Sequence, residues 1–134
     1  MIELSRAEID ALLHERVVGR IGCHAGGVTY VVPVIYAYDG AAVYVASIEG
    51  SKIRMMRESP AVCFETDEHG ETGWRSVIAQ ARYEELAGAD AERALELLAQ
   101  RFPGSRGRRA DGGGRGTVCF RLVLGETTGR AVRR

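Results

Sequence analysis

The chain has 134 residues and a formal net charge of +0, with 46% hydrophobic and 27% charged residues. These proportions are those of an ordinary globular protein, which excludes disordered, collagen-like and coiled-coil chains. A single domain, residues 1–134, is expected, because a chain of this length buries about two-thirds of the surface it exposes when unfolded. The zero net charge gives no global attraction to nucleic acid or anionic lipid, so neither is expected as a partner.

The N-terminus, Met-Ile-Glu-Leu-Ser-Arg, has an acid where a signal peptide carries bases, and no apolar run reaches the length of a membrane span. A cytoplasmic location is therefore expected. Cys23, Cys63 and Cys119 lie far apart inside strand-like runs, which indicates buried thiols rather than a disulfide framework. His24 and His69 have no Cys-x-x-Cys or His-x-x-x-His spacing around them, so no metal site is expected.

The predicted elements begin with a helix. Ser5 is its N-cap, Glu8 completes a capping box, and Leu4 is placed to pack on Ile9. After this helix the hydrophobic period changes to that of strands, with Ala-Gly-Gly and Asp-Gly turns between the runs. Strands are predicted at Val17–Cys23, Val28–Tyr38, Ala42–Ser47, Ala61–Thr66, Trp74–Leu86 and Thr117–Leu124, and further helices at Ser51–Ser59 and Asp90–Phe102.

Polar composition predicts a loop at Asp67–Gly73, and the Gly- and Arg-rich segment Pro103–Gly116 predicts a flexible loop. The first three strands read as a meander. Pro33, inside the second of them, cannot donate a ladder hydrogen bond, so that strand is expected at an edge, at a bulge or open to a ligand. Six strands in antiparallel connections with flanking helices predict a small barrel of the α+β class, mainly β.

The stretch Glu49-Gly-Ser-Lys52 has two interpretations. A glycine, the free amides of a helix N-terminus and the charge of Lys52 would suit a phosphate, with Arg54 and Arg57 nearby on the same helix. Alternatively, Gly50 makes a turn, Ser51 caps the helix and Lys52 is solvated. A P-loop is excluded, because Ile53 follows the lysine where that motif needs Ser or Thr.

The order of motifs along the chain resembles the FMN-binding split-barrel family. The similarity is greatest to the branch related to pyridoxamine 5′-phosphate oxidase that includes the nitroimidazole-resistance (Nim) proteins. The motifs are Val-Pro-Val-Ile-Tyr36, Val-Tyr-Val-Ala-Ser47, Glu-Gly-Ser-Lys-Ile-Arg-Met-Met-Arg57, Ser-Pro-Ala-Val-Cys-Phe64, Trp-Arg-Ser-Val77 and Ala-Arg-Tyr-Glu-Glu-Leu86. The resemblance runs from the first helix to Thr-Thr-Gly-Arg130.

This resemblance implies a six-stranded antiparallel split barrel that forms a homodimer, with one FMN in each of two grooves between the subunits. It assigns the FMN phosphate to Ser51 and Lys52, with Arg54 or Arg57 as helpers. The remaining cofactor-binding positions that it implies are Val32, Pro33 and Val34 along the isoalloxazine ring, Ala46 and Ser47 on the next strand, and Trp74, Arg75 and Ser76 on a later strand. At most one of Tyr36 and Tyr44 is assigned to the pocket.

One departure from the family pattern affects the expected chemistry. Many Nim-like relatives carry a histidine in a Tyr-Gly-His-Ser segment, and this chain has Tyr44-Val-Ala-Ser47, with Ala46 in its place. Two functions therefore stay open. One is an FMN-dependent oxidoreductase that reduces a small electron-poor molecule, as a nitroreductase does; the other is a non-catalytic module that binds FMN, haem or a deazaflavin on the same scaffold.

Overall fold

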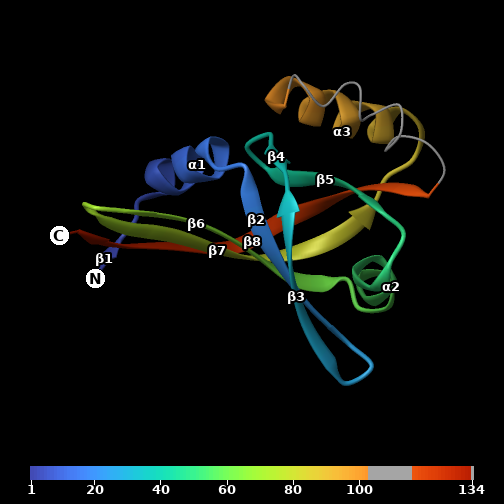
Figure 1. Ribbon diagram of the computed structural model, residues 1–134, viewed down its shortest axis with the longest axis horizontal. Helices are drawn as coiled ribbons and strands as arrows, with labels where there is room; N and C mark the ends of the chain where they lie inside the picture. Colours follow the sequence, from blue (N-terminus) through green and yellow to red (C-terminus); the bar gives the residue numbers. More distant parts are fainter. Residues whose placement is uncertain (103–115, 134) are drawn as a thin grey trace.

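The computed structural model describes residues 1–102 and 116–133, and its main feature is one antiparallel sheet of eight strands in that part of the chain (Figure 1). The strands are β1 (Ile2–Glu3), β2 (Val18–Ala25), β3 (Val28–Ile35), β4 (Ala37–Tyr38), β5 (Ala42–Ile48), β6 (Ala61–Gly70), β7 (Gly73–Glu85) and β8 (Thr117–Arg133). The helices are α1 (Arg6–Glu15), α2 (Ser51–Glu58) and α3 (Gly88–Arg101). The strand order is β3-β2-β6-β7-β8-β5-β4, with β1 added to β8.

The two faces of the curled sheet are covered differently. Its inner face forms the main core, in which Ile21, Phe64 and Val77 pack with side chains from α1 and α2. On the outer face, α3 packs on β5 and β8, where Tyr44 and Cys119 join Ala94 in a second, smaller cluster. The predicted α+β barrel is confirmed as a class, although the described strands number eight rather than six.

The first helix forms as the sequence predicts. The Ser5 hydroxyl accepts the Glu8 amide at 3.2 Å, and the Glu8 carboxylate accepts the Ser5 amide at 2.8 Å, which is a complete capping box. A Cβ at Gly129 would lie 2.8 Å from an Ile9 side-chain carbon, so glycine allows α1 to pack closely on β8. The cap and this close contact fix the helix over the sheet.

The predicted three-stranded meander is wrong in its middle strand. β3 ends at Ile35, and Tyr36 turns into the core, where its hydroxyl donates to the Leu13 carbonyl oxygen at 2.7 Å. The chain then enters β4, which pairs with β5 at the opposite end of the strand order from β3. Two strands that are consecutive in the chain are thus not hydrogen-bonded neighbours, and the barrel is split between them. β3 is an edge strand, as Pro33 predicts.

Two further boundaries differ from the prediction. The expected loop Asp67–Gly73 is mostly strand, because β6 continues to Gly70 and pairs with β7 residue by residue up to Gly73. The last strand does not stop at Leu124, since a register shift between Ala79 and Ala81 lets β8 continue to Arg133. α3 begins at Gly88 rather than at Asp90, which lies in its first turn.

The flexible loop predicted at Pro103–Gly116 lies outside the described residues, apart from Gly116. Cys23, Cys63 and Cys119 form no disulfide; Cys23 and Cys119 are buried, as the sequence predicts, and Cys63 is partly buried. Among residues 1–102 and 116–133, no helix combines the length and apolar character needed to cross a bilayer.

Candidate functional site

The predicted phosphate-binding residues lie at the N-terminus of α2, at the right of Figure 1. Gly50 is the N-cap and makes no side-chain hydrogen bond, and Ser51 is the first helical residue, so Ser51 is not the cap. Its hydroxyl instead accepts a hydrogen bond from Arg54 at 3.3 Å. In the part of the chain that the structure describes, no side chain caps the first amides of α2, which makes this helix end suited to an anion.

Lys52 is half-buried at this helix end and is the only lysine of the 134-residue sequence. Its Nζ donates to the Ser47 hydroxyl on β5 at 2.5 Å. Burial lowers the pKa of Lys52, and the nearby Cys23 thiol acts weakly in the opposite direction. Within residues 1–102 and 116–133, no carboxylate lies within ion-pair distance of this ammonium group, so its charge is not cancelled there.

The other cations of α2 are in a different situation. Arg57 makes two hydrogen bonds to the Glu85 carboxylate, at 2.7 and 3.0 Å, and one to Glu49 at 3.0 Å. These carboxylates raise the pKa of Arg57 and neutralise its charge. Of the two helpers that the resemblance suggested, Arg57 is therefore engaged within the protein, and Arg54 contacts the Ser51 hydroxyl.

Strand alternation divides the predicted isoalloxazine-contacting residues between two faces. Val32 packs against the main core and Val34 is buried in it, whereas Pro33 lies on the outer face and is exposed. On β5, Ala46 packs against the smaller cluster below α3, and Ser47 points toward Lys52. Ser47, Ser51 and Lys52 lie together, and Val32 pairs with Ile21, two residues before Cys23 on β2. We call these four residues the α2 end.

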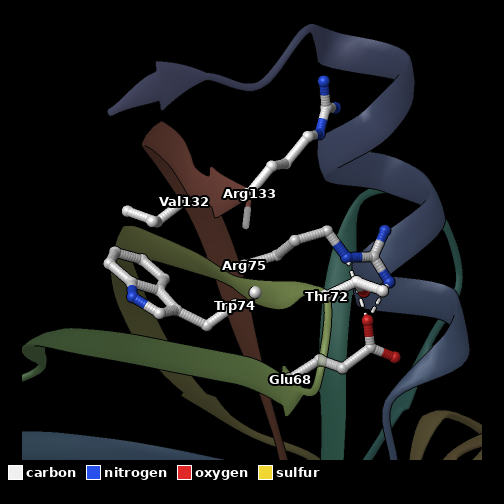
Figure 2. Close-up of a pocket in the computed structure, with 7 residues that line it drawn as sticks. Glu68, Thr72, Trp74, Arg75, Val132 and Arg133 are labelled. Carbon is white, nitrogen blue, oxygen red and sulfur yellow. Dashed lines mark hydrogen bonds and ion pairs between the residues drawn. The ribbon is translucent and has the colours of Figure 1, made fainter.

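The remaining predicted residues lie at the turn of the long β6–β7 hairpin, around a pocket of about 250 Å³. Figure 2 shows Trp74 and Val132 on one side of the strands and the Arg75–Glu68 pair on the side of α1. The pocket is lined by Glu68, Thr72, Gly73, Trp74, Arg75, Val132 and Arg133. We call this group, with Ser76 next to it on β7, the hairpin end.

The guanidinium group of Arg75 is held by carboxylates. Its Nε and Nη2 donate to Glu68 at 3.0 and 2.6 Å, and Glu15 lies 3.6 Å away. Arg16 donates to the second oxygen of Glu68 at 3.1 Å. Arg75 lowers the pKa of Glu68, so the pair stays ionised and has little charge left for a ligand.

The α2 end and the hairpin end lie far apart in one chain. Each end can be placed beside a residue of β6. Lys52 lies close to Cys23, which follows the Gly22 that pairs with Cys63. Trp74 pairs with His69. Cys63 and His69 are six residues apart on β6, which corresponds to about 20 Å at a rise of about 3.3 Å per residue. Figure 1 shows the same separation, with α2 at the right and the β6–β7 turn at the left. One chain does not bring the ten predicted residues into a single site.

Neither tyrosine considered for the pocket has a free face. Tyr36 is buried, and burial raises its pKa to about 12. Tyr44 is buried below α3 and donates to Asp39 at 3.0 Å. The pocket residues that sequence reasoning missed are Glu68, Thr72, Gly73, Val132 and Arg133. Three of them belong to the segment that was expected to be a loop, and the last two follow the point at which β8 was expected to end.

The antiparallel fold with its break between β3 and β4 defines the class of FMN-binding split barrels. Residues 5–131 match the sequence profile of the pyridoxamine 5′-phosphate oxidase family. The chain therefore belongs to this family.

Individual relatives agree with this assignment. The chain is 33% identical over 84 residues to an uncharacterised protein of Rhizobium meliloti (strain 1021), a match that covers 62% of this chain and 56% of that protein. It is 34% identical to an FAD-binding protein of Mesorhizobium loti, with a TM-score of 0.81 over 98% of this chain and 97% of the other. A candidate 5-nitroimidazole antibiotic resistance protein of Bacteroides thetaiotaomicron has a TM-score of 0.85 at 18% identity, over 97% and 86% of the two chains.

Proposed function

We propose that this protein binds FMN, and that the flavin phosphate lies at the α2 end. The observation that carries this proposal is Lys52, a half-buried ammonium group at an uncapped helix N-terminus that no described carboxylate neutralises. A phosphate there would receive a charge-assisted hydrogen bond from Lys52 and the free amides of α2. Ser47 and Ser51 add hydroxyl groups at the same place. Membership of the family and the flavin bound by the Mesorhizobium relative support the same cofactor class.

We further infer that the protein acts as a homodimer. The α2 end supplies charge for a phosphate and an apolar strand, and the hairpin end supplies Trp74. The two ends lie about 20 Å apart along β6, so one chain does not bring them into a single site. Two chains related by a two-fold axis would place the α2 end of one beside the hairpin end of the other, and would do so twice. This arrangement would bring the matched residues of the α2 end and of the hairpin end together in each of two grooves.

The proposed activity is that of an oxidoreductase acting on a small electron-poor substrate such as a nitro compound. A bound flavin would supply the hydride chemistry, and the protein would supply binding and orientation. Lys52 and Ser47 would hold the phosphate, and Val32 would support the ring. With Ala46 in place of the family histidine, this position offers no proton donor. That feature favours the second candidate function, a module that holds FMN, haem or a deazaflavin without turnover.

The first experiment is the absorbance spectrum of the purified protein, with chromatography of the released cofactor to distinguish FMN from FAD, haem and deazaflavin. We expect a yellow protein that releases FMN, and a Lys52→Ala variant with about 10- to 100-fold weaker flavin binding, because a hydrogen bond to a charged group contributes about 1.5–3 kcal/mol. Arg57→Ala is the matched control, since its charge is already neutralised, and it should retain the flavin. Equal loss of flavin in both variants would contradict the assignment of Lys52.

A second experiment separates the two candidate functions. The flavin-loaded protein is mixed with NADH or NADPH and with nitroaromatic acceptors, and reduction of the acceptor is followed over many turnovers. Sustained turnover supports the oxidoreductase. A flavin that stays oxidised with either donor, or that is reduced once without passing electrons on, would support the binding module instead.

A further inference from the structure

Among residues 1–102 and 116–133, no helix covers one part of the sheet surface. The outer face of β3, β2, β6 and β7, which we call the open face, lies beyond the area that α3 covers. The register places Pro33 beside Arg20, Arg20 beside Glu65, and Glu65 beside Ile78 in one row across these strands. Ile78 in this row is exposed, and the exposed apolar side chains of Val18, Val31 and Ile35 lie beside the row.

A group of three charged side chains stands in the middle of the open face. Arg20 Nη1 donates to Glu65 Oε1 at 3.0 Å and lies 3.4 Å from Asp67 Oδ2. Glu65 and Asp67 are two residues apart on β6, so they point to the same side. Two carboxylates therefore meet one guanidinium group, which leaves one negative charge in excess when both are ionised.

The excess charge affects the titration of Glu65. Burial and the neighbouring Asp67 carboxylate raise the pKa of Glu65 to about 7, although Arg20 acts in the opposite direction. The neighbouring strands present Pro33 from β3 and Ile78 from β7, neither of which carries charge.

Three other titratable or charged groups lie on this face near the cluster. His69 on β6 lies 4.0 Å from Asp67. Cys63 lies two residues before Glu65 on β6 and points to the same side. Arg130 on β8 pairs with Ser76 on β7, which in turn pairs with Asp67. Because the pKa of Glu65 is raised to about 7, the cluster of Arg20, Glu65 and Asp67 exchanges near neutral pH between a form with one excess negative charge and a form with none.

The surface suits a second copy of this chain, as the proposed homodimer requires. Pro33 has no N–H to donate, so it interrupts any strand that would add to the β3 edge, and contact through the face is favoured over contact through the edge. The face is apolar around a cluster that is neutral when protonated, so two copies of it can meet without a net repulsion. The exchange of the α2 and hairpin ends also needs a second copy of this chain rather than another partner.

We propose that the open face is the dimer contact and that the Arg20–Glu65–Asp67 cluster couples this contact to pH, so that the dimer becomes tighter as pH falls through neutrality. This inference rests on the proposed homodimer. Contact removes water from the cluster, and desolvation favours the neutral form of a carboxyl group. Each chain then takes up a proton on Glu65 as the dimer forms. One proton per chain gives a change of up to about 100-fold in the dimer dissociation constant per pH unit.

The test is a dilution series of the purified full-length protein by analytical ultracentrifugation at pH 6, 7 and 8, with flavin content recorded in each sample. We expect the dissociation constant to rise at least about 10-fold between pH 6 and pH 8, within the limit that one proton per chain sets. Glu65→Gln, which imitates the protonated form, should keep a tight dimer at pH 8 with little dependence on pH. His69→Gln is the matched control and should keep the wild-type dependence.

Three results would overturn the proposal. They are a dissociation constant that does not change with pH, one that changes in the opposite direction, and a Glu65→Gln variant with the same pH dependence as the wild type. Each of these results differs from a failure of the flavin proposal. A yellow protein whose dimer dissociation constant does not change with pH would contradict only this inference. A colourless protein whose dimer becomes tighter at low pH would contradict the flavin proposal and support this inference.

Discussion

The α2 end and the hairpin end both contain cations, but only at the α2 end is there a cation, Lys52, that no described carboxylate neutralises. At the hairpin end Arg75 is bound by Glu68 and approached by Glu15, so its positive charge stabilises the protein's own carboxylates. At the α2 end Lys52 contacts a neutral hydroxyl, and burial lowers its pKa because its charge is incompletely compensated. A basic residue is therefore a candidate for anion binding when the fold places no carboxylate beside it.

The largest expected effect comes from mixing two defective variants. Lys52→Met and Trp74→Ala should each weaken flavin binding at both grooves of their own homodimer. In a mixed dimer, one groove combines the intact Lys52 of one chain with the intact Trp74 of the other, and the second groove has both defects. We therefore expect tight binding of about half a flavin per chain in the heterodimer, a gain of about 10- to 100-fold over the Lys52→Met homodimer.

Differently tagged chains, co-expressed and purified by both tags, allow this measurement by flavin titration. A heterodimer that binds no better than its parents would show that the two ends do not form a shared groove. The wild-type pair carrying both tags is the control for effects of the tags themselves.

A smaller effect is expected for Trp74→Ala alone. Aromatic contacts contribute about 0.5–1.5 kcal/mol beyond area burial, so the flavin dissociation constant should rise by up to about 10-fold. Trp74→Phe keeps an aromatic ring at the position and should recover most of the affinity. Flavin fluorescence quenching gives both numbers. If Trp74→Ala binds flavin as tightly as the wild type, the hairpin end does not contribute to the groove.

The smallest effect is on stability, and its sign is opposite to the effect on binding. Because burial lowers the pKa of Lys52, the folded chain holds this charge less favourably than the unfolded chain does at any pH below the lysine's ordinary pKa. Lys52→Met should therefore raise the free energy of unfolding of the flavin-free protein at pH 7, by at most about 1 kcal/mol given the partial exposure. Urea unfolding of both flavin-free proteins measures this difference. A less stable Lys52→Met protein would mean that the hydrogen bond to Ser47 outweighs the burial cost.

Local signals in the sequence predicted local structure well. The capping box at Ser5 and Glu8 and the turn at Gly26-Gly27 each depend on a few adjacent residues, and the structure confirms them. Of the three positions that Pro33 allowed for its strand, the structure shows the edge. The family assignment is also confirmed. These inferences needed no knowledge of which distant segments meet.

Features that depend on pairing between distant segments were not predicted. The polar residues Asp67, Glu68 and His69 read as a loop, and they form strand because β7 supplies a partner for each. Tyr36 follows the end of β3, and its hydroxyl donates a hydrogen bond to the Leu13 carbonyl oxygen in α1. The separation of the predicted site into two ends follows from the length of the hairpin, which is known only when its register is known. The placement of the ten cofactor positions in one groove remains a prediction.

The unbroken pairing of β6 with β7 has a consequence for the distance between the two flavin sites of the proposed dimer. Partners run in register from Ala61 and Arg82 to Gly70 and Gly73. A Cβ at Gly73 would collide with the Val132 carbonyl oxygen, so the hairpin is closed against β8 at its tip. In a dimer that exchanges its ends, this hairpin is a stiff spacer that fixes how far apart the two flavins lie. Two residues added to each strand would preserve the alternation of side chains and lengthen the spacer by about 7 Å, enough to separate both half-sites at once.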